Sequence, residues 1–340
     1  MAASTRACKM RLVEKTGMTA KRSLLSGFGG YLPERIVTND ELASRLDTSD
    51  EWIRGRTGIG QRHIAGENDT AVSMATEAAR RALEYAGATP ADVDAVIVAT
   101  STPDQAFPST AVRVQAGLGM SSGFGFDLAA ACSGFIYALS MADSLIRSGQ
   151  ARSALVIGSE VYSRILDWSD RGTCVLFGDG AGAVFLTSAG PQDSDAGILS
   201  THLHSDGQYG DLLYVDGATG QHDRPAHLRM NGREVFRHAV GKLSSSVDEA
   251  LAANNLTHSD VNWLVPHQAN LRIIDGVARK LALPAERVVV TVDRHANTSA
   301  ASIPLALNEA VRDGRIRKGD LVLMEALGGG LTWGSALARL

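Results

Sequence analysis

A cysteine, a histidine and an asparagine occupy similar places in the pattern of apolar runs. Cys132 lies between the short apolar stretch "FGFDLAA" and residues that recur at the three-to-four spacing of a helix face. His267 follows "NWLVP" and precedes a helix pattern opened by Asn270, and Asn297 follows "RVVVTVDRHA" and precedes "TSAAS". Because crevices form at the carboxyl ends of strands in open α/β sheets, we expect these three side chains to converge on one site.

The thiol has a chemical reason to lie at the start of a helix. A helix N-terminus carries partial positive charge and unpaired N–H groups, which favour thiolate over thiol. The thiolate is the nucleophilic form, so the position predicts a lowered pKa for Cys132 and covalent acyl transfer through its sulfur. The same N–H groups can hold an oxyanion.

Each of the three residues also has a structural explanation. A buried cysteine is most often a small core hydrophobe, a single histidine is usually satisfied within the fold, and an asparagine before "TS" is commonly a turn or cap residue. The shared topological position of Cys132, His267 and Asn297 favours the functional interpretation.

Two glycine-rich stretches have different surroundings. In "GGGLTWGSAL" (328–337) three glycines follow the apolar run "LVLMEAL", so the backbone can approach a ligand closely and supply a second oxyanion donor, unless the stretch is only a loose turn. In "FGDGAG" (177–182) the glycines precede a strand pattern and do not open a helix. We therefore reject the second stretch as a dinucleotide or phosphate loop.

Apolar runs and helical spacings alternate along the chain. The runs predict strands at 95–100, 124–129, 153–160, 180–189 (antiparallel), 262–266, 287–292 and 321–327. The spacings predict helices at 70–86, 133–148, 231–253, 269–282 and 299–313. This alternation favours an α/β fold with a mostly parallel sheet.

A weak internal repeat appears at an offset of 168 residues. "ALEYAGATPADVDAVIVAT" aligns without gaps with "ALAANNLTHSDVNWLVPHQ", and each copy reads as a helix end, a polar loop and a strand start. Chance similarity between two such units is the alternative. The repeat predicts two duplicated halves, 23–190 with the cysteine and 191–340 with the histidine and asparagine.

Composition excludes several classes of protein. The 340 residues carry a net charge of −4, so no global basic field for nucleic acid exists. No apolar run approaches the ~18 residues that a membrane span needs. The three cysteines lack metal-type spacing, and their odd number suits a reducing compartment, so we expect a cytoplasmic location.

The first residues read differently from the rest. The segment 1–22 is basic with Glu14 as its one acid, and it lacks the pattern of a secretory signal. It could be a transit peptide, but an early start codon, an added leader or a disordered arm together fit better. We expect 1–22 to be a disordered extension.

Several long motifs, taken in order, resemble those of β-ketoacyl-acyl-carrier-protein synthases III, which have the thiolase fold. They are "LDTSDEWIRGRTGI", "AFPSTA", "LAAACSGF", "DRGTCVLFGDGAGA", "HLHSDG", "WLVPHQANLRII" and "HANTSAAS". The resemblance runs from "GGYLPERIVTN" to the C-terminus and implies two duplicated halves in αβαβα layers. It implies a Cys132–His267–Asn297 site. Elongating condensing enzymes typically carry two histidines, so Asn297 favours the priming type.

The resemblance also implies a mechanism. Cys132 would take the acyl group of an acyl-CoA, with acetyl-CoA expected, while the N–H groups of Cys132 and Gly329 hold the oxyanion. Malonyl-acyl-carrier protein would follow, and His267 and Asn297 would stabilise the enolate formed as CO2 leaves. CoA would enter as a thioester substrate, with no cofactor and no metal. Neutral donors suffice, because charge develops near the transition state.

Further binding residues follow from the same resemblance. Trp52, Arg56 and Arg171 match positions that hold the adenine and phosphates of CoA, and Asn270 matches a pantetheine-binding residue. An indole stacks on a base and a guanidinium pairs with phosphate, which agrees with these roles. The alternatives are an ordinary helix with a half-buried Trp52, and Asn270 as a helix N-cap.

The acyl pocket contains a departure from the family pattern. Leu327 stands where the family often has Phe, so the apolar wall is kept without the ring. Phe107 matches a residue that lines the acyl pocket, and we expect it to do so from the partner subunit of a homodimer.

A basic surface is expected because acyl-carrier proteins are acidic. Arg237 and Arg272 match the family's docking positions, and with Arg279 and Lys280 they could form this surface. The alternative is that these side chains only lie on solvated helix faces. For Arg233 and Lys280 the sequence favours neither interpretation.

Three other functions have partly similar sequence features. A related thiolase-fold enzyme with another starter or acceptor, of polyketide or quinolone type, is the nearest alternative. A papain-like protease has a similar catalytic set but needs its cysteine near the mature N-terminus. A non-catalytic scaffold on this fold would not release CO2 from malonyl-carrier protein.

Overall fold

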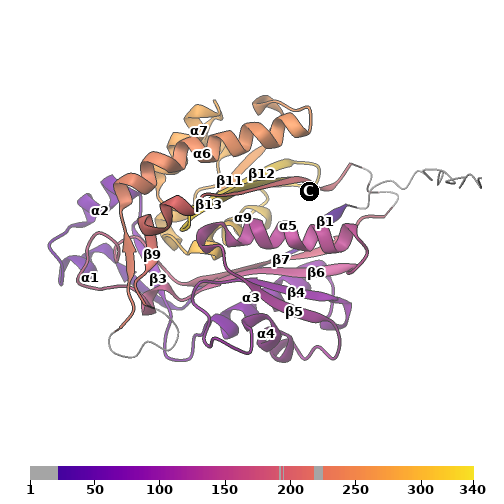
Figure 1. The fold of residues 1–340 in the computed structure, drawn as a ribbon, viewed down its shortest axis with the longest axis horizontal. Helices are drawn as coiled ribbons and strands as arrows, with labels where there is room; N and C mark the ends of the chain where they lie inside the picture. The colour runs from indigo at the N-terminus through magenta and orange to yellow at the C-terminus, as the bar shows by residue number, and fades with distance from the viewer. Residues whose placement is uncertain (1–21, 191–192, 194, 218–224) are drawn as a thin grey trace, which may run out of the picture.

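The computed structural model describes residues 22–190, 193, 195–217 and 225–340. Cys8, nearly all of the predicted extension 1–22 and the first residues of the predicted second half therefore lie outside the described residues. Figure 1 shows two β-sheets with one helical layer between them and one on each outer side. The predicted αβαβα layering is confirmed.

The first sheet has five strands in the order β1, β7, β6, β4, β5. Their bounds are β1 (Ser23–Tyr31), β7 (Gly180–Ser188), β6 (Ser153–Glu160), β4 (Ala95–Ala99) and β5 (Phe124–Leu128). The strands β6, β4 and β5 are parallel, whereas β7 runs antiparallel to both of its neighbours. Because β1 is antiparallel to β7, four of the five strands run in one direction and β7 alone is reversed. The predicted mostly parallel sheet and the predicted antiparallel strand at 180–189 are both confirmed, whereas β1, which carries no clear apolar run, was missed.

The second sheet has four strands in the order β11, β12, β13, β8. Their bounds are β11 (Trp263–Pro266), β12 (Leu321–Gly328), β13 (Thr332–Arg339) and β8 (Gly197–Ser205). The strands β11 and β12 are parallel, and the other pairs are antiparallel. The predicted strand at 287–292 is wrong. That segment forms one bridge from Val288 to Leu264 and then the short helix α8 (Val292–His295).

Helices cover both faces of each sheet, as Figure 1 shows. The outer layers are α3 (Ala71–Ala86) with α4 (Thr110–Leu118), and α6 (Gly232–Ala253) with α7 (Leu271–Lys280). The middle layer is α5 (Gly134–Arg147) with α9 (Ser302–Arg312). Because the central strands β4 and β6 are buried along their whole length, they read as continuous apolar runs rather than as an alternating pattern.

Short elements gather at one end of the molecule. They are β2 (Arg35–Thr38), α1 (Asn39–Ala43), α2 (Asp50–Thr57), β3 (Gln61–Ile64), η3 (Tyr162–Arg164), η4 (Gly207–Leu212), β9 (Leu213–Val215) and β10 (Leu228–Met230). In Figure 1, α1, α2, β3 and β9 lie together at the left end of the layers.

The repeat found in the sequence has a matching local structure. In η1 (Pro90–Asp92) the N–H and hydroxyl of Thr89 both donate to Asp92 Oδ2 at 2.8 Å. In η5 (His258–Asp260) the N–H and hydroxyl of Thr257 donate to Asp260 Oδ2 at 2.7 and 2.8 Å. Each turn directly precedes a parallel strand, β4 or β11. The two segments thus share their conformation as well as their residue pattern.

Glycines of β1 let α3 approach the first sheet closely. A Cβ at Gly29 would lie 2.1 Å from the Ala78 carbonyl oxygen, and a Cβ at Gly27 would lie 2.2 Å from that of Ala82. Ala78 and Ala82, which carry these two carbonyl oxygens, belong to the alanine-rich buried face of α3. The backbone contact therefore requires glycine in the strand and small residues in the helix.

We predict that Gly29→Ala destabilises the protein by about 1–3 kcal/mol or more, because α3 must move away from β1. Urea unfolding at unchanged m-value measures the loss. Gly241→Ala is the matched control, since a Cβ there meets nothing within 4 Å in the middle of α6. The control should stabilise the helix by about 1 kcal/mol. Equal unfolding midpoints for Gly29→Ala and the wild type would contradict the packing argument.

Candidate active site

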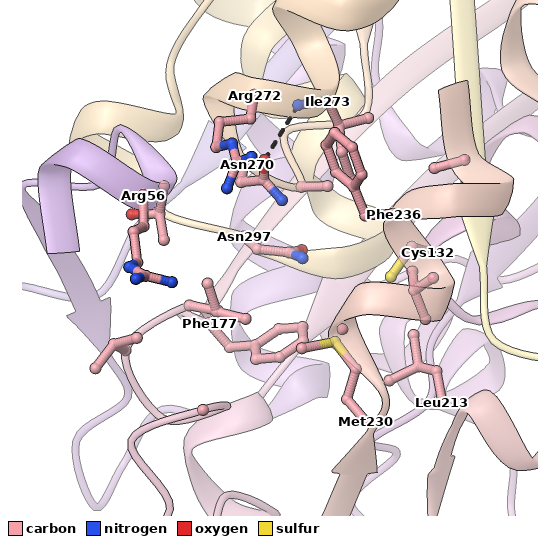
Figure 2. A pocket seen from close by; sticks show the side chains of 18 of the residues that line it. Arg56, Cys132, Phe177, Leu213, Met230, Phe236, Asn270, Arg272, Ile273 and Asn297 are labelled. Atoms are coloured by element: carbon pink, nitrogen blue, oxygen red, sulfur yellow. Dashed lines mark hydrogen bonds between the residues drawn. The ribbon is translucent and has the colours of Figure 1, made fainter. Parts of the chain in front are cut away.

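One cavity of about 460 Å³ contains the three predicted catalytic residues. Cys132, His267 and Asn297 all line it. Its other lining residues include Trp52, Arg56, Arg171, Phe177, Leu213, Met230, Arg233, Phe236, Leu243, Asn270, Arg272, Ile273 and Leu327. Figure 2 shows Asn297 between Arg56 on one side and Cys132 on the other. The predicted convergence is thus what the fold produces.

Cys132 lies in a tight turn that is tied to the second sheet. The turn is η2 (Ala131–Ser133), directly before α5, and Ala131 has a φ of 45°. A Cβ at Gly328 would lie 2.7 Å from the Cys132 backbone nitrogen. The Thr332 hydroxyl donates to the Ala130 carbonyl at 3.0 Å. The end of β12 and the start of β13 therefore hold the turn in place from across the molecule.

The predicted lowering of the Cys132 pKa is wrong for the free protein. Burial raises the pKa of this thiol to about 12, and the charge of Glu160 acts in the same direction. Hydrogen bonding from the hydroxyls of Ser299 and Tyr162 favours the thiolate but is outweighed. The sequence places a helix start beside the sulfur, but it does not reveal how completely neighbouring segments exclude water.

His267 follows β11 and is fixed at both its backbone and its ring. Its N–H donates to the Glu325 carbonyl at 2.8 Å, and its Nδ1 lies 2.7 Å from the Ser302 hydroxyl. Burial lowers the pKa of His267 to about 3, so the ring is neutral. If Ser302 donates to Nδ1, the proton sits on Nε2, and the ring can then donate a hydrogen bond from Nε2.

Asn297 is held by a segment far away in the sequence. Its N–H donates to the Leu176 carbonyl, its carbonyl accepts from the Gly178 N–H, and both bonds are 3.0 Å. Its Oδ1 accepts from the Ser299 N–H at 2.9 Å, which leaves the amide NH2 free to donate. The residue does not end a parallel strand as predicted, because 287–292 forms none. It reaches the cavity through this pairing with 176–178 instead.

One end of the cavity combines an indole with two guanidinium groups. The Cζ atoms of Arg56 and Arg171 lie 4.9 and 5.2 Å from the centroid of the Trp52 ring. The Arg171 guanidinium also donates hydrogen bonds to the backbone carbonyl and to the side-chain carboxylate of Asp47. A flat ring flanked by cations offers stacking and phosphate-pairing groups at one place.

Asn270 fits both of its sequence interpretations. Its Oδ1 accepts from the Ile273 N–H at 3.1 Å and caps α7, and the residue also lines the cavity. The dashed line in Figure 2 marks this bond. The capping bond engages Oδ1 and leaves the amide NH2 to the cavity side.

The predicted acyl-pocket and oxyanion residues lie in three different settings. Leu327 is buried and lines the cavity. Phe107 is 85% exposed and does not line the cavity of its own chain. Gly329 packs against β9, where an added Cβ would lie 2.6 Å from the Leu213 carbonyl. Gly328 is the glycine whose missing Cβ lets the backbone approach Cys132.

The predicted docking cations lie on α6 and α7 but differ in their surroundings. Arg272 lines the cavity and its Cζ lies 5.4 Å from the Phe236 ring. Arg237 forms an ion pair with Glu234 at 2.6 Å. Arg279 and Lys280 are exposed in the last turn of α7. Arg233, about which the sequence was undecided, lines the cavity as Arg272 does.

Several residues of the site were missed from the sequence. Ser299 and Ser302 position the asparagine and the histidine, and both belong to the motif "NTSAAS". Glu160 is a fully buried acid at the carboxyl end of a predicted apolar strand, a position that could have singled it out. Tyr162 stacks on Phe177 with ring centroids 4.9 Å apart, and no sequence pattern predicted it.

Three further findings concern metal sites, membrane spans and disulfides. Within the described ranges, no group of three or more His, Cys, Asp or Glu side chains is placed to hold a metal ion. No helix among the described residues is both long and apolar enough to span a bilayer. Cys132 and Cys174 are free thiols.

Comparisons with known proteins cover almost the whole chain. Family models described as 3-oxoacyl-[acyl-carrier-protein (ACP)] synthase III and its C-terminal part match residues 126–207 and 251–340. The β-ketoacyl-[acyl-carrier-protein] synthase III of Acidiphilium cryptum is 72% identical over 319 residues, or 94% of this chain and 99% of the relative. That of Granulibacter bethesdensis is 66% identical over 94% of this chain and 100% of the relative.

Solved structures of similar fold include members of the same family. The 3-oxoacyl-[acyl-carrier-protein] synthase III from Aquifex aeolicus has a TM-score of 0.89 and 47% identity over 94% of this chain and 100% of its own. The priming β-ketosynthase of the R1128 polyketide pathway has a TM-score of 0.89 and 38% identity over 94% and 97%. Xanthomonas campestris OleA, at 20% identity and a TM-score of 0.83, shares the fold.

A second buried acid lies near the histidine. Glu325 is 1% exposed on β12, and its Oε2 has no hydrogen-bond partner. The residue lies on the same face of β12 as Leu323 and Leu327, which pack in the cluster under α6. Burial raises the pKa of Glu325 to about 8, so this carboxyl is protonated at neutral pH.

We predict that Glu325→Gln stabilises the protein increasingly as the pH rises from 4.5 to about 8. The folded chain keeps this proton throughout that range, whereas the unfolded chain loses it above its ordinary pKa of 4.5. Wild-type stability from this group therefore falls as the pH rises, and glutamine removes the loss. Thermal unfolding of both proteins across the range measures the difference, with the exposed Glu286→Gln as the charge-removal control. A constant difference at all pH values would contradict the prediction.

Proposed function

Because this chain belongs to the β-ketoacyl-[acyl-carrier-protein] synthase III family, we propose that it starts fatty acid synthesis from acetyl-CoA. The protein is an acyltransferase of the condensing type. It joins an acyl-CoA to malonyl-acyl-carrier protein and produces 3-oxoacyl-acyl-carrier protein and CO2. The residue roles, the starter, the dimer and the location given below are parts of the proposal.

One observation carries the assignment of roles. A thiol, a neutral imidazole and an amide donor line the same cavity, and this cavity continues to an indole flanked by two arginines. A thioester substrate that carries a nucleotide at its far end needs a reactive centre at one end of the cavity and a nucleotide-binding group at the other. Trp52, Arg56 and Arg171 would bind the nucleotide while the pantetheine chain passes Asn270 toward Cys132.

The first step is transfer of the acyl group to Cys132. The sulfur attacks the thioester carbonyl, and CoA leaves as its thiolate. The Cys132 N–H would hold the oxyanion together with the Gly329 N–H, the second donor that we propose. The adjoining apolar wall, which includes Leu327, keeps water from the acyl-enzyme.

The second step is decarboxylation and condensation. As CO2 leaves the malonyl group, negative charge moves to the thioester oxygen, where the His267 ring and the Asn297 amide would donate hydrogen bonds. Both groups are neutral donors in a buried site, so they stabilise a developing charge without requiring a strong base. The carbanion then attacks the acyl group on Cys132. Decarboxylation supplies the electron pair, so we expect no cofactor.

Fatty acid initiation is favoured over a polyketide or quinolone-type condensation. The synthase III relatives share 72% and 66% of their residues with this chain, against 38% for the polyketide priming enzyme. Acetyl-CoA is the expected starter, although Leu327 leaves an apolar wall without the aromatic ring that the family often has.

A homodimer would explain an exposed apolar edge. Phe107 and Phe124 are 85% and 41% exposed, and β5, which carries Phe124, is the edge strand of the first sheet. Val112 on neighbouring α4 is 42% exposed as well. Pairing of two copies along this edge would bury these side chains and could bring Phe107 to the acyl pocket of the partner subunit.

The acidic carrier protein would approach over α6 and α7. Arg233 and Arg272 flank the cavity, and the exposed Arg237, Arg279 and Lys280 extend the positive surface along both helices. Arg237 contributes less net charge because Glu234 pairs with it. We place the reaction in the cytoplasm, where the free thiol of Cys132 stays reduced.

We predict that Cys132→Ser abolishes acyl loading, because a hydroxyl is a much weaker nucleophile in the same place. Intact-mass measurement after incubation with acetyl-CoA should give one added acetyl group on the wild type and none on the variant. Cys174→Ser, which alters the other buried thiol, is the control and should load normally. Loading of wild type and Cys132→Ser to the same extent would refute the acyl-cysteine.

We predict that His267→Ala and Asn297→Ala keep acyl loading but lose decarboxylation. Each removes a donor that acts on the enolate, and loss of one such donor costs about 10²–10³-fold in rate. Release of labelled CO2 from malonyl-acyl-carrier protein measures this step, and acetyl mass on Cys132 in the same sample is the internal control. Normal CO2 release by both variants would contradict the assigned roles.

A further inference from the structure

Gln268 is a fully buried amide next to a residue of the proposed catalytic set. Its neighbours His267, Ala269 and Asn270 line the cavity, whereas Gln268 does not and is 0% exposed. Its side chain therefore does not touch the substrate. A polar side chain buried this deeply needs hydrogen-bond partners within the protein.

The amide of Gln268 forms all four hydrogen bonds of which an amide is capable. Its Nε2 donates to the carbonyls of Pro266 at 2.8 Å and Val289 at 3.0 Å. Its Oε1 accepts from the N–H groups of Thr291 at 2.8 Å and Val292 at 3.1 Å. Two carbonyls at one end and two N–H groups at the other fix which end is the nitrogen. The side chain thus ties the end of β11 to the start of α8.

This connection takes the place of a strand pairing. Among the described residues, the backbone before α8 pairs with β11 only around Val288 and Val289. The N–H groups of Thr291 and Val292 lie at the start of α8, where a helix supplies no acceptor of its own. Within the described ranges, Gln268 Oε1 is their only acceptor.

A single helical turn connects this anchor to Asn297. The N–H groups of His295 and Ala296 donate back to the start of α8 at 2.9 and 3.1 Å. Asn297 follows directly, and its amide NH2 is the donor proposed for the enolate. Because these bonds make α8 a rigid spacer, the Gln268 amide sets the position of Asn297 relative to the end of β11.

The backbone of Gln268 acts on the other proposed donor. Its N–H donates to the Ser302 hydroxyl oxygen at 3.3 Å, and that hydroxyl lies 2.7 Å from His267 Nδ1. In the described part of the chain, the hydroxyl has no other acceptor within hydrogen-bond distance, so its proton points to Nδ1. His267 then carries its own proton on Nε2, as a donor to the enolate requires.

We propose that Gln268 is a positioning residue that holds the Asn297 amide in register with the His267 ring, so that both donors meet one enolate oxygen. The proposal rests on the proposed function, because it concerns the decarboxylation step. Cys132 is held instead by the ends of β12 and β13. The Gln268 amide should therefore affect decarboxylation and leave acyl loading unchanged.

The first test replaces the amide by an apolar side chain of similar length. Gln268→Met removes all four side-chain hydrogen bonds. We expect normal acetyl mass on Cys132 but about 100-fold slower release of labelled CO2 from malonyl-acyl-carrier protein, since a misplacement of about 1 Å costs that much. The kcat should fall while the KM for malonyl-acyl-carrier protein changes little.

The matched control removes another buried hydrogen bond. Ser153→Ala deletes a buried hydroxyl at the start of β6 that donates to the Asp92 carbonyl at 2.6 Å. It should lower the unfolding midpoint and still release CO2 at the wild-type rate.

A double variant separates positioning of Asn297 from general disruption of the site. If the amide acts through Asn297, then Gln268→Met in the Asn297→Ala background should slow CO2 release by no more than about threefold further. A second loss of about 100-fold in that background would overturn the proposal.

Gln268→Glu adds a signature that loss of stability alone would not produce. A protonated carboxyl can donate to one of the two carbonyls, whereas a carboxylate places negative charge against both. Burial raises the pKa of an introduced carboxyl. The ratio of variant to wild-type CO2 release should therefore be highest at about pH 5 and fall about tenfold or more by about pH 8.

The other titratable and charged groups around Gln268 are common to both proteins, so the ratio isolates the introduced carboxyl. They lie beside it in the chain or on β12, α8 and α9, and they are His267, Glu325, Asp293, Arg294, His295 and Glu309. This readout also remains if the methionine variant folds poorly.

The outcomes are distinct. Normal CO2 release by Gln268→Met would overturn the proposal, and so would equal losses of acetyl loading and CO2 release. A ratio that does not change with pH in Gln268→Glu would overturn it as well. If acetylated wild-type protein releases no CO2 from malonyl-acyl-carrier protein, the proposed function itself fails.

Discussion

Exclusion of water from one small volume governs this protein's chemistry. Cys132, His267 and Glu160 are each at most 5% exposed, and burial is the largest influence on the pKa of all three. In such surroundings each group prefers its neutral form, and an unpaired charge is costly. The site is therefore suited to reactions in which charge appears briefly and is met by donors already in position.

The layered fold places those donors from separate parts of the chain. Cys132 comes from the turn after β5, His267 from the end of β11, and Asn297 from the segment after α8. Contacts across the layers lock them together, including the approach of Gly328 to the Cys132 backbone and the pairing of Asn297 with 176–178. Because each donor is held by a different element, the geometry is preorganised before any substrate binds.

Two serine residues hold the histidine and the asparagine in their orientations. Ser302 contacts the imidazole, Ser299 orients the asparagine through its backbone N–H, and both come from one short motif. The same motif thus positions both the histidine and the asparagine.

The sequence by itself determined which residues could react and on what kind of fold. Apolar runs, helix spacings and the 168-residue repeat identified most elements and the three cavity residues, since local patterns record burial and periodicity. It missed the strands β1, β8 and β13, placed a strand wrongly at 287–292 and misjudged the pKa of Cys132. Strand pairing, the placement of Asn297 by 176–178 and the desolvation of the thiol were decided by the tertiary structure alone. These properties arise from contacts between segments that no local pattern records.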